Sequence, residues 1–296
     1  MAKYITPAVT PFLDDGRIDE AGCNALYEHL ITGGIDGILV LGSIGEFFSI
    51  PVEEKKRLIS IAVHKAAGRV PVMAGTADMV FSNVLELSDY ALAEGADSVI
   101  VVSPYYFRLE PEQIFTYYDT LAKAIDGRIY LYNFPDRTGY TIPADIVRRL
   151  AESHPNIVGI KDTISGLDHT RELIKAVKPV RPEFEIYSGF DDNFAHNVLC
   201  GGDGCIAGLS NVAPELCHSW VTAVNTGNWA ESARIQQVIN RLMDIYSVGA
   251  PFIPFIKAAA ALRGVPVQNI LGFPFPGVTE SEKEKLRTIL SRDGLL

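Results

Sequence analysis

The sequence predicts a (β/α)8 barrel, or TIM barrel, followed by a C-terminal helical extension. Short apolar runs typical of buried parallel strands alternate with longer stretches of helical periodicity, and eight such pairs occupy about the first 225 residues. An open doubly wound sheet is the alternative, but no glycine-rich dinucleotide fingerprint follows the first run. We therefore expect a closed parallel barrel.

The expected strands are short runs bounded by turn residues. They cover residues 5–10, 37–41, 70–75, 98–102, 129–133, 157–161, 184–188 and 204–207. Strand signals stop near residue 225, and three helical stretches follow at residues 229–246, 251–263 and 279–292. We therefore expect a barrel domain over residues 1–225 and a three-helix domain over residues 226–296.

Capping and first-turn residues mark where the helices begin. Glu53 and Glu54 follow Pro51 in a first turn, where acidic side chains interact favourably with the helix dipole. The expected helix starts are the cap Asp19, then Pro51, Pro111, Pro143, either Asp191 or Asp192, and Pro214.

The composition excludes several kinds of partner. Apolar residues make up 48% of the 296 residues and charged residues 21%, an ordinary globular balance. Because 26 basic and 36 acidic residues give a formal charge of −10 and no basic run occurs, we expect no nucleic-acid partner. No apolar stretch approaches the ~18 residues required to cross a bilayer, so we expect no membrane association.

The four cysteines predict neither a zinc site nor a disulfide framework. They show no CxxC spacing and no accompanying histidine pair, so buried reduced thiols are expected. The first residues lead directly into an apolar run without the basic and apolar regions of a secretory signal. We expect a cytoplasmic protein.

Lys161 is the strongest candidate for a catalytic residue. It ends a run of four uncharged residues, and an ammonium group is costly in an apolar interior unless it is paired or loses its charge. A neutral lysine is the nucleophile that Schiff-base enzymes use against carbonyl carbon. The alternative is a strand-end lysine that extends into solvent.

Other polar groups follow the ends of the expected strands, where barrels of this kind carry their chemistry. The turn Gly42-Ser43-Ile44-Gly45-Glu46 offers amide groups that can bind a carboxylate, although simple loop closure would also explain it. Tyr106 and Tyr132 can relay protons, or they are rim tyrosines. Amine attack on a ketone needs a nucleophile, a proton shuttle and an anion seat, and all three are present.

Two other kinds of site are not supported. Asp191 and Asp192 form one acidic pair without further metal ligands and are more typical of a helix N-cap, so we expect no metal. None of the six histidines is placed like the base of a hydrolase triad.

Together these residues resemble the pyruvate-dependent class I aldolase family, which includes N-acetylneuraminate lyase and dihydrodipicolinate synthase. The resemblance covers essentially the whole chain and rests on the motifs at residues 42–46, 104–106, 132–135 and 159–163. It implies that Lys161 forms the Schiff base and that Tyr132 transfers protons. It also implies that Tyr106 reaches into a neighbouring subunit's site, and hence a homo-oligomer, often a tetramer.

The resemblance further implies how a keto acid is bound, without any cofactor. Ser43 and the backbone of Ile44 would bind the carboxylate, and the Ile206 carbonyl would contact the keto acid. Many relatives carry threonine or glycine where Ile44 stands, so a hydroxyl contact is lost here.

The resemblance leaves several substrates open. The motifs at residues 46–47, 159–163 and 189–192 are most similar to the 2-keto-3-deoxygluconate aldolase branch, where Thr163 would contact substrate hydroxyls. Arg137 instead stands where dihydrodipicolinate synthases bind the carboxylate of aspartate semialdehyde, or it is a surface arginine. The bulky pair Phe47-Phe48 favours the sugar-acid aldolase. A keto-deoxy sugar acid dehydratase and a non-catalytic keto-acid binding protein are the remaining alternatives.

Overall fold

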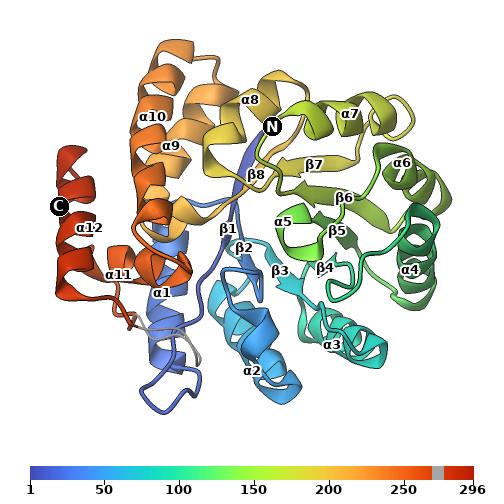
Figure 1. Cartoon of the computed structure of the whole chain (residues 1–296), viewed down its shortest axis with the longest axis horizontal. Helices are drawn as coiled ribbons and strands as arrows, with labels where there is room; N and C mark the ends of the chain where they lie inside the picture. Colours follow the sequence, from blue (N-terminus) through green and yellow to red (C-terminus); the bar gives the residue numbers. More distant parts are fainter. Residues whose placement is uncertain (269–276) are drawn as a thin grey trace. The chain divides into compact units, whose positions relative to one another are not determined.

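The computed structural model describes residues 1–268 and 277–296, and within them eight parallel strands close into a barrel in the order β1 to β8 (Figure 1). The strands are β1 (Lys3–Pro7), β2 (Gly37–Val40), β3 (Val72–Gly75), β4 (Ser98–Val102), β5 (Ile129–Asn133), β6 (Ile157–Asp162), β7 (Glu185–Ser188) and β8 (Gly204–Ile206). The predicted (β/α)8 barrel is confirmed. Residues 269–276, which belong to the predicted C-terminal domain, lie outside the described residues.

The expected strands agree with the observed ones most closely in β4 and β5, whose bounds match the predicted ranges. Every residue of these two strands is buried, as is usual when both faces of a parallel sheet are covered. β1 differs, because it ends at Pro7 and not at residue 10. The Val9 amide donates to Oδ1 of Asn211 at 3.0 Å, and this side-chain acceptor replaces a neighbouring strand.

The described residues also contain twelve α-helices and four 3-10 turns. The helices are α1 (Glu20–Thr32), α2 (Val52–Ala66), α3 (Phe81–Glu94), α4 (Pro111–Ala124), α5 (Pro135–Thr138), α6 (Ala144–Ser153), α7 (Asp168–Val177), α8 (Phe194–Leu199), α9 (Pro214–Asn225), α10 (Trp229–Leu242), α11 (Ile253–Leu262) and α12 (Glu280–Arg292). The 3-10 turns are η1 (Phe47–Ser49), η2 (Asp191–Asn193), η3 (Gly208–Asn211) and η4 (Met243–Ser247). No described helix is both long and apolar enough to cross a membrane.

Most predicted helix starts are correct to within one residue. Asp19 caps α1 by accepting from the Gly22 amide at 3.0 Å, and α4 and α9 begin at Pro111 and Pro214. Asp191 begins the 3-10 turn that leads into α8. Pro51 and Pro143 are N-caps and not first-turn residues, because their ψ angles of 151° and 146° are extended.

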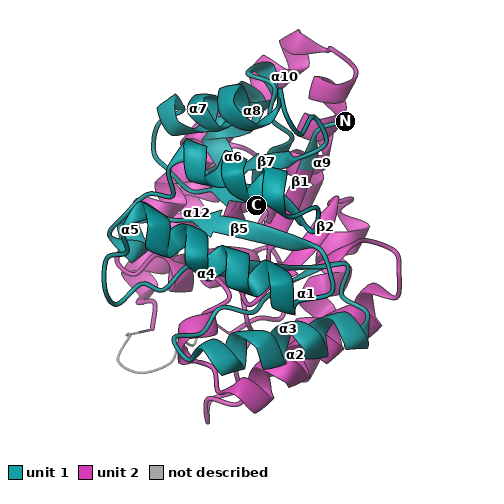
Figure 2. Cartoon of the chain, turned by 90° about the vertical axis from the view of Figure 1, so that its right-hand side faces the viewer, with its two compact units in different colours: residues 1–3, 73–206 teal, residues 4–72, 207–296 magenta. Residues whose placement is uncertain are grey.

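The chain divides into two compact units, which Figure 2 distinguishes by colour. Unit 1 comprises residues 1–3 and 73–206 and holds β4 to β8 with nearly all of β3. Unit 2 comprises residues 4–72 and 207–296 and holds β2, most of β1 and helices α9 to α12. In unit 2, α11 packs against α12, η3 and η4. The separation of a barrel domain from a three-helix domain after residue 225 stays a prediction.

Candidate active site

In unit 1, Tyr132 and Lys161 lie side by side at the carboxyl ends of β5 and β6. The strand register pairs the two residues directly, and Nζ of Lys161 lies 4.5 Å from the centroid of the Tyr132 ring. Each residue is only 4% exposed. The structure thus brings together the amine and the phenol that the sequence singled out.

Lys161 has no counter-ion in the part of the chain that the structure describes. Its one interaction there is with the Tyr132 ring, and no hydrogen bond or ion pair reaches its Nζ atom. Lys257, which is also buried, forms an ion pair with Glu46 at 2.5 Å. A buried amine that lies against a phenol ring, without a carboxylate beside it, is placed where a Schiff-base nucleophile would be expected.

Thr163 lies two residues after Lys161 and has a buried hydroxyl group. The residue is 5% exposed, and its Oγ1 makes no hydrogen bond within residues 1–268 and 277–296. Its backbone is held by the bond from its amide to the Asn133 carbonyl at 2.9 Å. A Cβ atom on Gly189, the residue after β7, would lie 1.8 Å from Oγ1, so only glycine leaves room for this hydroxyl.

In unit 2, hydrogen bonds and an ion pair hold the turn that contains Ser43. The Gly45 carbonyl accepts from Oγ1 of Thr10 at 2.7 Å, and the Glu46 amide donates to the Ser43 carbonyl at 3.2 Å. Glu46 has a left-handed φ of 61° and is anchored through its ion pair with Lys257. A fixed turn suits the role of an anion seat, because its amide groups keep one direction.

Ile44 and Ile206 are both buried, at 6% and 0% exposure. Ile44 packs over Gly208, where an added Cβ atom would come within 2.9 Å of its Cδ1 atom. Because Gly208 has no side chain, the Ile44 side chain can occupy the space beside it. Ile206 is the last residue of β8.

Arg137 lies on α5 and is exposed, but its guanidinium group contacts an aromatic ring. It stacks over Phe134 at 5.0 Å, and the Phe134 ring in turn stacks on Tyr132 with centroids 5.8 Å apart. The Phe134 ring therefore lies in contact with both Arg137 and Tyr132, the candidate proton shuttle. Tyr106, in contrast, is 78% exposed and contacts the Phe107 ring edge-on at 5.0 Å.

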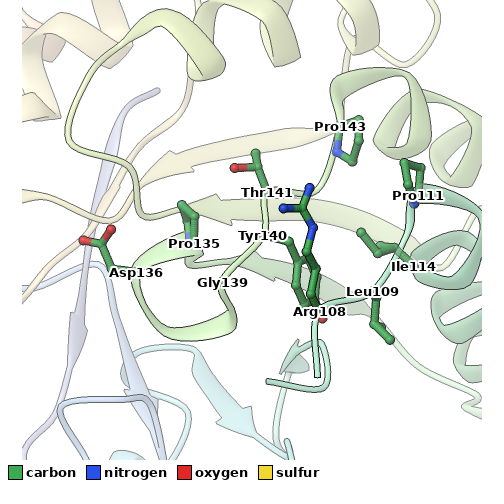
Figure 3. A pocket seen from close by; sticks show the side chains of 10 residues that line it. All are labelled: Arg108, Leu109, Pro111, Ile114, Pro135, Asp136, Gly139, Tyr140, Thr141 and Pro143. Carbon is green, nitrogen blue, oxygen red and sulfur yellow. The ribbon is translucent and has the colours of Figure 1, made fainter. Parts of the chain in front are cut away.

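A separate groove of about 420 Å³ lies beside α5 in unit 1 (Figure 3). Arg108, Tyr140 and Thr141 contribute polar groups to it, and none of the predicted site residues lines it. Among the residues that the structure describes, no group of three or more His, Cys, Asp or Glu side chains is arranged to hold a metal ion.

Sequence reasoning gave no role to a buried polar group behind the candidate catalytic pair. The Asp162 carboxylate accepts from Nδ2 of Asn133 and from Oγ1 of Thr170, both at 2.7 Å, and it also pairs with His169. A signal was present, because a carboxylate at a strand end and a histidine in the next helix's first turn are neighbours in a barrel. From the sequence alone, the histidines are considered only as bases or metal ligands.

Comparison with known proteins identifies the relatives of this chain. A model of the dihydrodipicolinate synthetase family matches residues 1–293. The chain belongs to this family. The family resemblance inferred from the motifs is thereby confirmed.

Several family members are similar over nearly their whole length. YagE of Escherichia coli K12, named as a candidate 2-dehydro-3-deoxy-D-gluconate aldolase, is 36% identical over 97% of this chain and 95% of its own. YjhH of the same organism, named as a probable 2-dehydro-3-deoxy-D-pentonate aldolase, is 35% identical over 99% and 97%. The 4-hydroxy-tetrahydrodipicolinate synthase of Kosmotoga olearia is 35% identical over 97% of each chain.

Solved structures of the dihydrodipicolinate synthetase family share the fold. The crystal structure of YagE in complex with pyruvate has a TM-score of 0.97 at 35% identity, covering 100% of this chain and 99% of YagE. The dihydrodipicolinate synthase of Thermotoga maritima has a TM-score of 0.94 at 30% identity, with the same coverage of both chains.

Proposed function

We propose that this protein is a Schiff-base aldolase that reversibly cleaves a 2-keto-3-deoxy sugar acid, such as 2-keto-3-deoxygluconate, into pyruvate and an aldehyde. The observation that carries the proposal is the buried amine of Lys161, which lies against the Tyr132 ring without a counter-ion. The family membership supports a pyruvate-dependent carbon–carbon lyase. The names of YagE and YjhH support a keto-deoxy sugar acid as the substrate.

The proposed reaction begins when the neutral amine of Lys161 attacks the C2 carbonyl carbon. Tyr132 donates its phenolic proton to the departing hydroxyl group, so that water leaves, an iminium ion forms and Tyr132 becomes a phenolate. The iminium ion accepts the electron pair of the C3–C4 bond as that bond breaks, the phenolate takes the proton of the C4 hydroxyl group, and the C4 fragment leaves as an aldehyde. Tyr132 then gives this proton to C3 of the enamine, and hydrolysis of the resulting iminium ion releases pyruvate, returns a proton to Tyr132 and regenerates Lys161.

The remaining site residues bind and orient the substrate in this proposal. Ser43 and the Ile44 amide hold the C1 carboxylate, which sets the direction of attack. The Ile206 carbonyl contacts the keto acid. Thr163 contacts a hydroxyl group of the sugar chain, because its buried Oγ1 has no hydrogen-bond partner in the described protein.

A second candidate is the condensation of pyruvate with aspartate semialdehyde. Arg137 favours it, because a guanidinium group that lies over the Phe134 ring suits the carboxylate of the semialdehyde. The Kosmotoga olearia relative is named for this kind of synthase. Steady-state assays with both sets of substrates discriminate between the two, and a dehydratase would consume a keto-deoxy acid without releasing pyruvate.

We also infer that the protein is a cytoplasmic homo-oligomer, a tetramer, in which Tyr106 reaches a partner's site. Tyr106 and Phe107 are 78% and 75% exposed, an unusual state for two adjacent aromatic rings unless another molecule covers them. The described residues contain no disulfide bond, which suits a reducing compartment. Analytical ultracentrifugation tests the assembly, and a monomer at micromolar concentration would contradict it.

Trapping the Schiff base tests the proposal directly. The protein is incubated with pyruvate, reduced with borohydride, digested and examined by mass spectrometry. We expect a reduced pyruvate adduct on Lys161 and none on Lys257, which serves as an internal control because it is a buried lysine with a counter-ion. Lys161→Ala and Lys161→Arg should abolish both adduct and turnover. A wild-type protein without an adduct would be a keto-acid binder, and the proposal would be wrong.

A further inference from the structure

The face of β5 and β6 that points away from the barrel interior carries polar residues directly behind the candidate catalytic pair. Consecutive residues of a strand point to opposite faces, so Asn133 and Asp162 lie on the other side of the sheet from Tyr132 and Lys161. The register pairs Tyr132 with Lys161 and Asn133 with Asp162. Each member of the catalytic pair therefore has a polar neighbour on the reverse face.

These polar residues form a closed ring of hydrogen bonds. Nδ2 of Asn133 donates to Oδ1 of Asp162 at 2.7 Å, and Nδ1 of His169 lies 3.0 Å from the same oxygen. Nε2 of His169 lies 2.9 Å from the Ile142 carbonyl oxygen. The Ile142 amide closes the ring by donating to Oδ1 of Asn133 at 3.0 Å. All members belong to unit 1, and His169, the most accessible of the three polar side chains, is 9% exposed.

The ring requires a charged histidine. One ring nitrogen of His169 faces a carboxylate and the other faces a carbonyl oxygen, and neither group can donate a hydrogen bond. Both nitrogens must carry hydrogen, so His169 is an imidazolium ion whose counter-ion is Asp162. Burial opposes the charge, but the bond and charge of Asp162, with contributions from the Ile142 carbonyl and Glu172, raise the pKa of His169 overall.

We propose that Asp162 and His169 are positioning residues that hold the ends of β5 and β6 together, so that the Lys161 amine and the Tyr132 phenol keep their reactive geometry. The inference rests on the aldolase function proposed above. The Nζ atom of Lys161 makes no hydrogen bond in the described chain, so the direction of the side chain depends on the strand that carries it. A displacement of about 1 Å at a reacting group can cost ~100-fold in rate.

The test compares three variants of the full-length protein with wild type. His169→Asn keeps a donor close to the position of Nδ1, His169→Leu removes both donors, and Thr170→Val removes the separate bond to Oδ2 of Asp162 while leaving the ring closed. For each variant we measure the rate of borohydride trapping with pyruvate, kcat and KM for the keto-deoxy acid, and Tm.

We expect kcat and the trapping rate to fall by about 10- to 100-fold in His169→Leu, with partial recovery in His169→Asn, while KM changes less than about threefold. Thr170→Val should retain more activity than His169→Leu. If His169→Leu does not fold, the other two variants still carry the comparison, because each removes fewer bonds.

The chain offers a matched control in a second aspartate–histidine pair. Nε2 of His154 lies 2.9 Å from Oδ1 of Asp119 in unit 1, and neither residue lies next to Lys161 or Tyr132 in the sequence. Asp119→Asn should leave kcat at the wild-type value. If the His169 variants have a lower Tm but keep the wild-type kcat, as the control is expected to do, the positioning role would be wrong. A wild-type protein that is not trapped by pyruvate would instead refute the aldolase proposal, and this inference with it.

Discussion

The carboxylate of Glu46 and the ammonium group of Lys257 form a fully buried ion pair, although 211 residues separate them in the sequence. The pair joins α11 to the end of the turn that contains Ser43, within unit 2. Glu46 occupies a left-handed conformation that is costly for a residue with a side chain. The ion pair thus stabilises the turn that we propose as the carboxylate seat.

Removing one partner of this pair should destabilise the protein strongly. Glu46→Gln or Lys257→Met breaks the ion pair and leaves its other member buried, and we expect a loss of about 3–5 kcal/mol in the free energy of unfolding. The double variant should recover most of it, because both members of the pair are then removed together. Urea unfolding measures the free energy of unfolding of the two single variants and the double variant. Single variants as stable as wild type would show that the pair contributes nothing.

Tyr132→Phe should separate binding from proton transfer. Removing the hydroxyl group is expected to lower kcat by about 10²–10⁴-fold, the usual contribution of a positioned acid–base group. A reduced pyruvate adduct should still form on Lys161, since the amine is unchanged. Tyr118→Phe is the control, because the Tyr118 hydroxyl donates to the Val101 carbonyl at 2.9 Å and has no role in the proposed reaction. Equal activities of the two variants would remove Tyr132 from the mechanism.

Thr163→Val should impair recognition of the sugar chain without harming the fold. The exchange replaces a buried hydroxyl group that has no partner in the described residues, so stability should stay within about 1 kcal/mol of wild type. Loss of one substrate hydrogen bond should raise KM for the keto-deoxy acid by about 5- to 10-fold, while pyruvate trapping is unaffected. An unchanged KM would mean that the hydroxyl group does not contact the substrate.

Arg137→Ala distinguishes the two candidate substrates. If the protein is a synthase, losing the guanidinium group should raise KM for aspartate semialdehyde by about 10-fold or more, the value of a hydrogen bond to a charged group. If it is a sugar-acid aldolase, KM for the keto-deoxy acid should change less than about threefold. Arg137→Lys keeps the charge but loses the planar stacking on Phe134, and it shows which of the two features matters.

The Asp162–His169 pair should make stability depend on pH. The folded protein raises the pKa of His169 above its value in the unfolded chain, about 6.5, so the protonated histidine favours folding. This contribution is complete below the unfolded pKa and is lost as the pH rises through the folded pKa. Urea unfolding across this range should show the advantage of wild type over His169→Leu shrinking toward high pH. An advantage that grows with pH would contradict the assignment of an imidazolium ion.

The sequence alone was sufficient for the fold and for placing Tyr132 beside Lys161. Apolar runs and helix caps are local signals, and they placed β4, β5 and the start of α4 correctly. Since the carboxyl ends of parallel strands meet at one rim of a barrel, the ends of neighbouring runs predicted that Tyr132 and Lys161 would lie together.

Tertiary structure alone decided which polar groups hold these elements in place. The partners of Asp162 come from β5, from α7 and, through His169, from the loop before α6, and the partner of Glu46 comes from α11. No periodic pattern encodes such pairs, because they depend on strand register and on how helices pack. The difference between Lys161 and Lys257 has the same origin, since both are buried lysines and only the folded chain gives one of them a carboxylate.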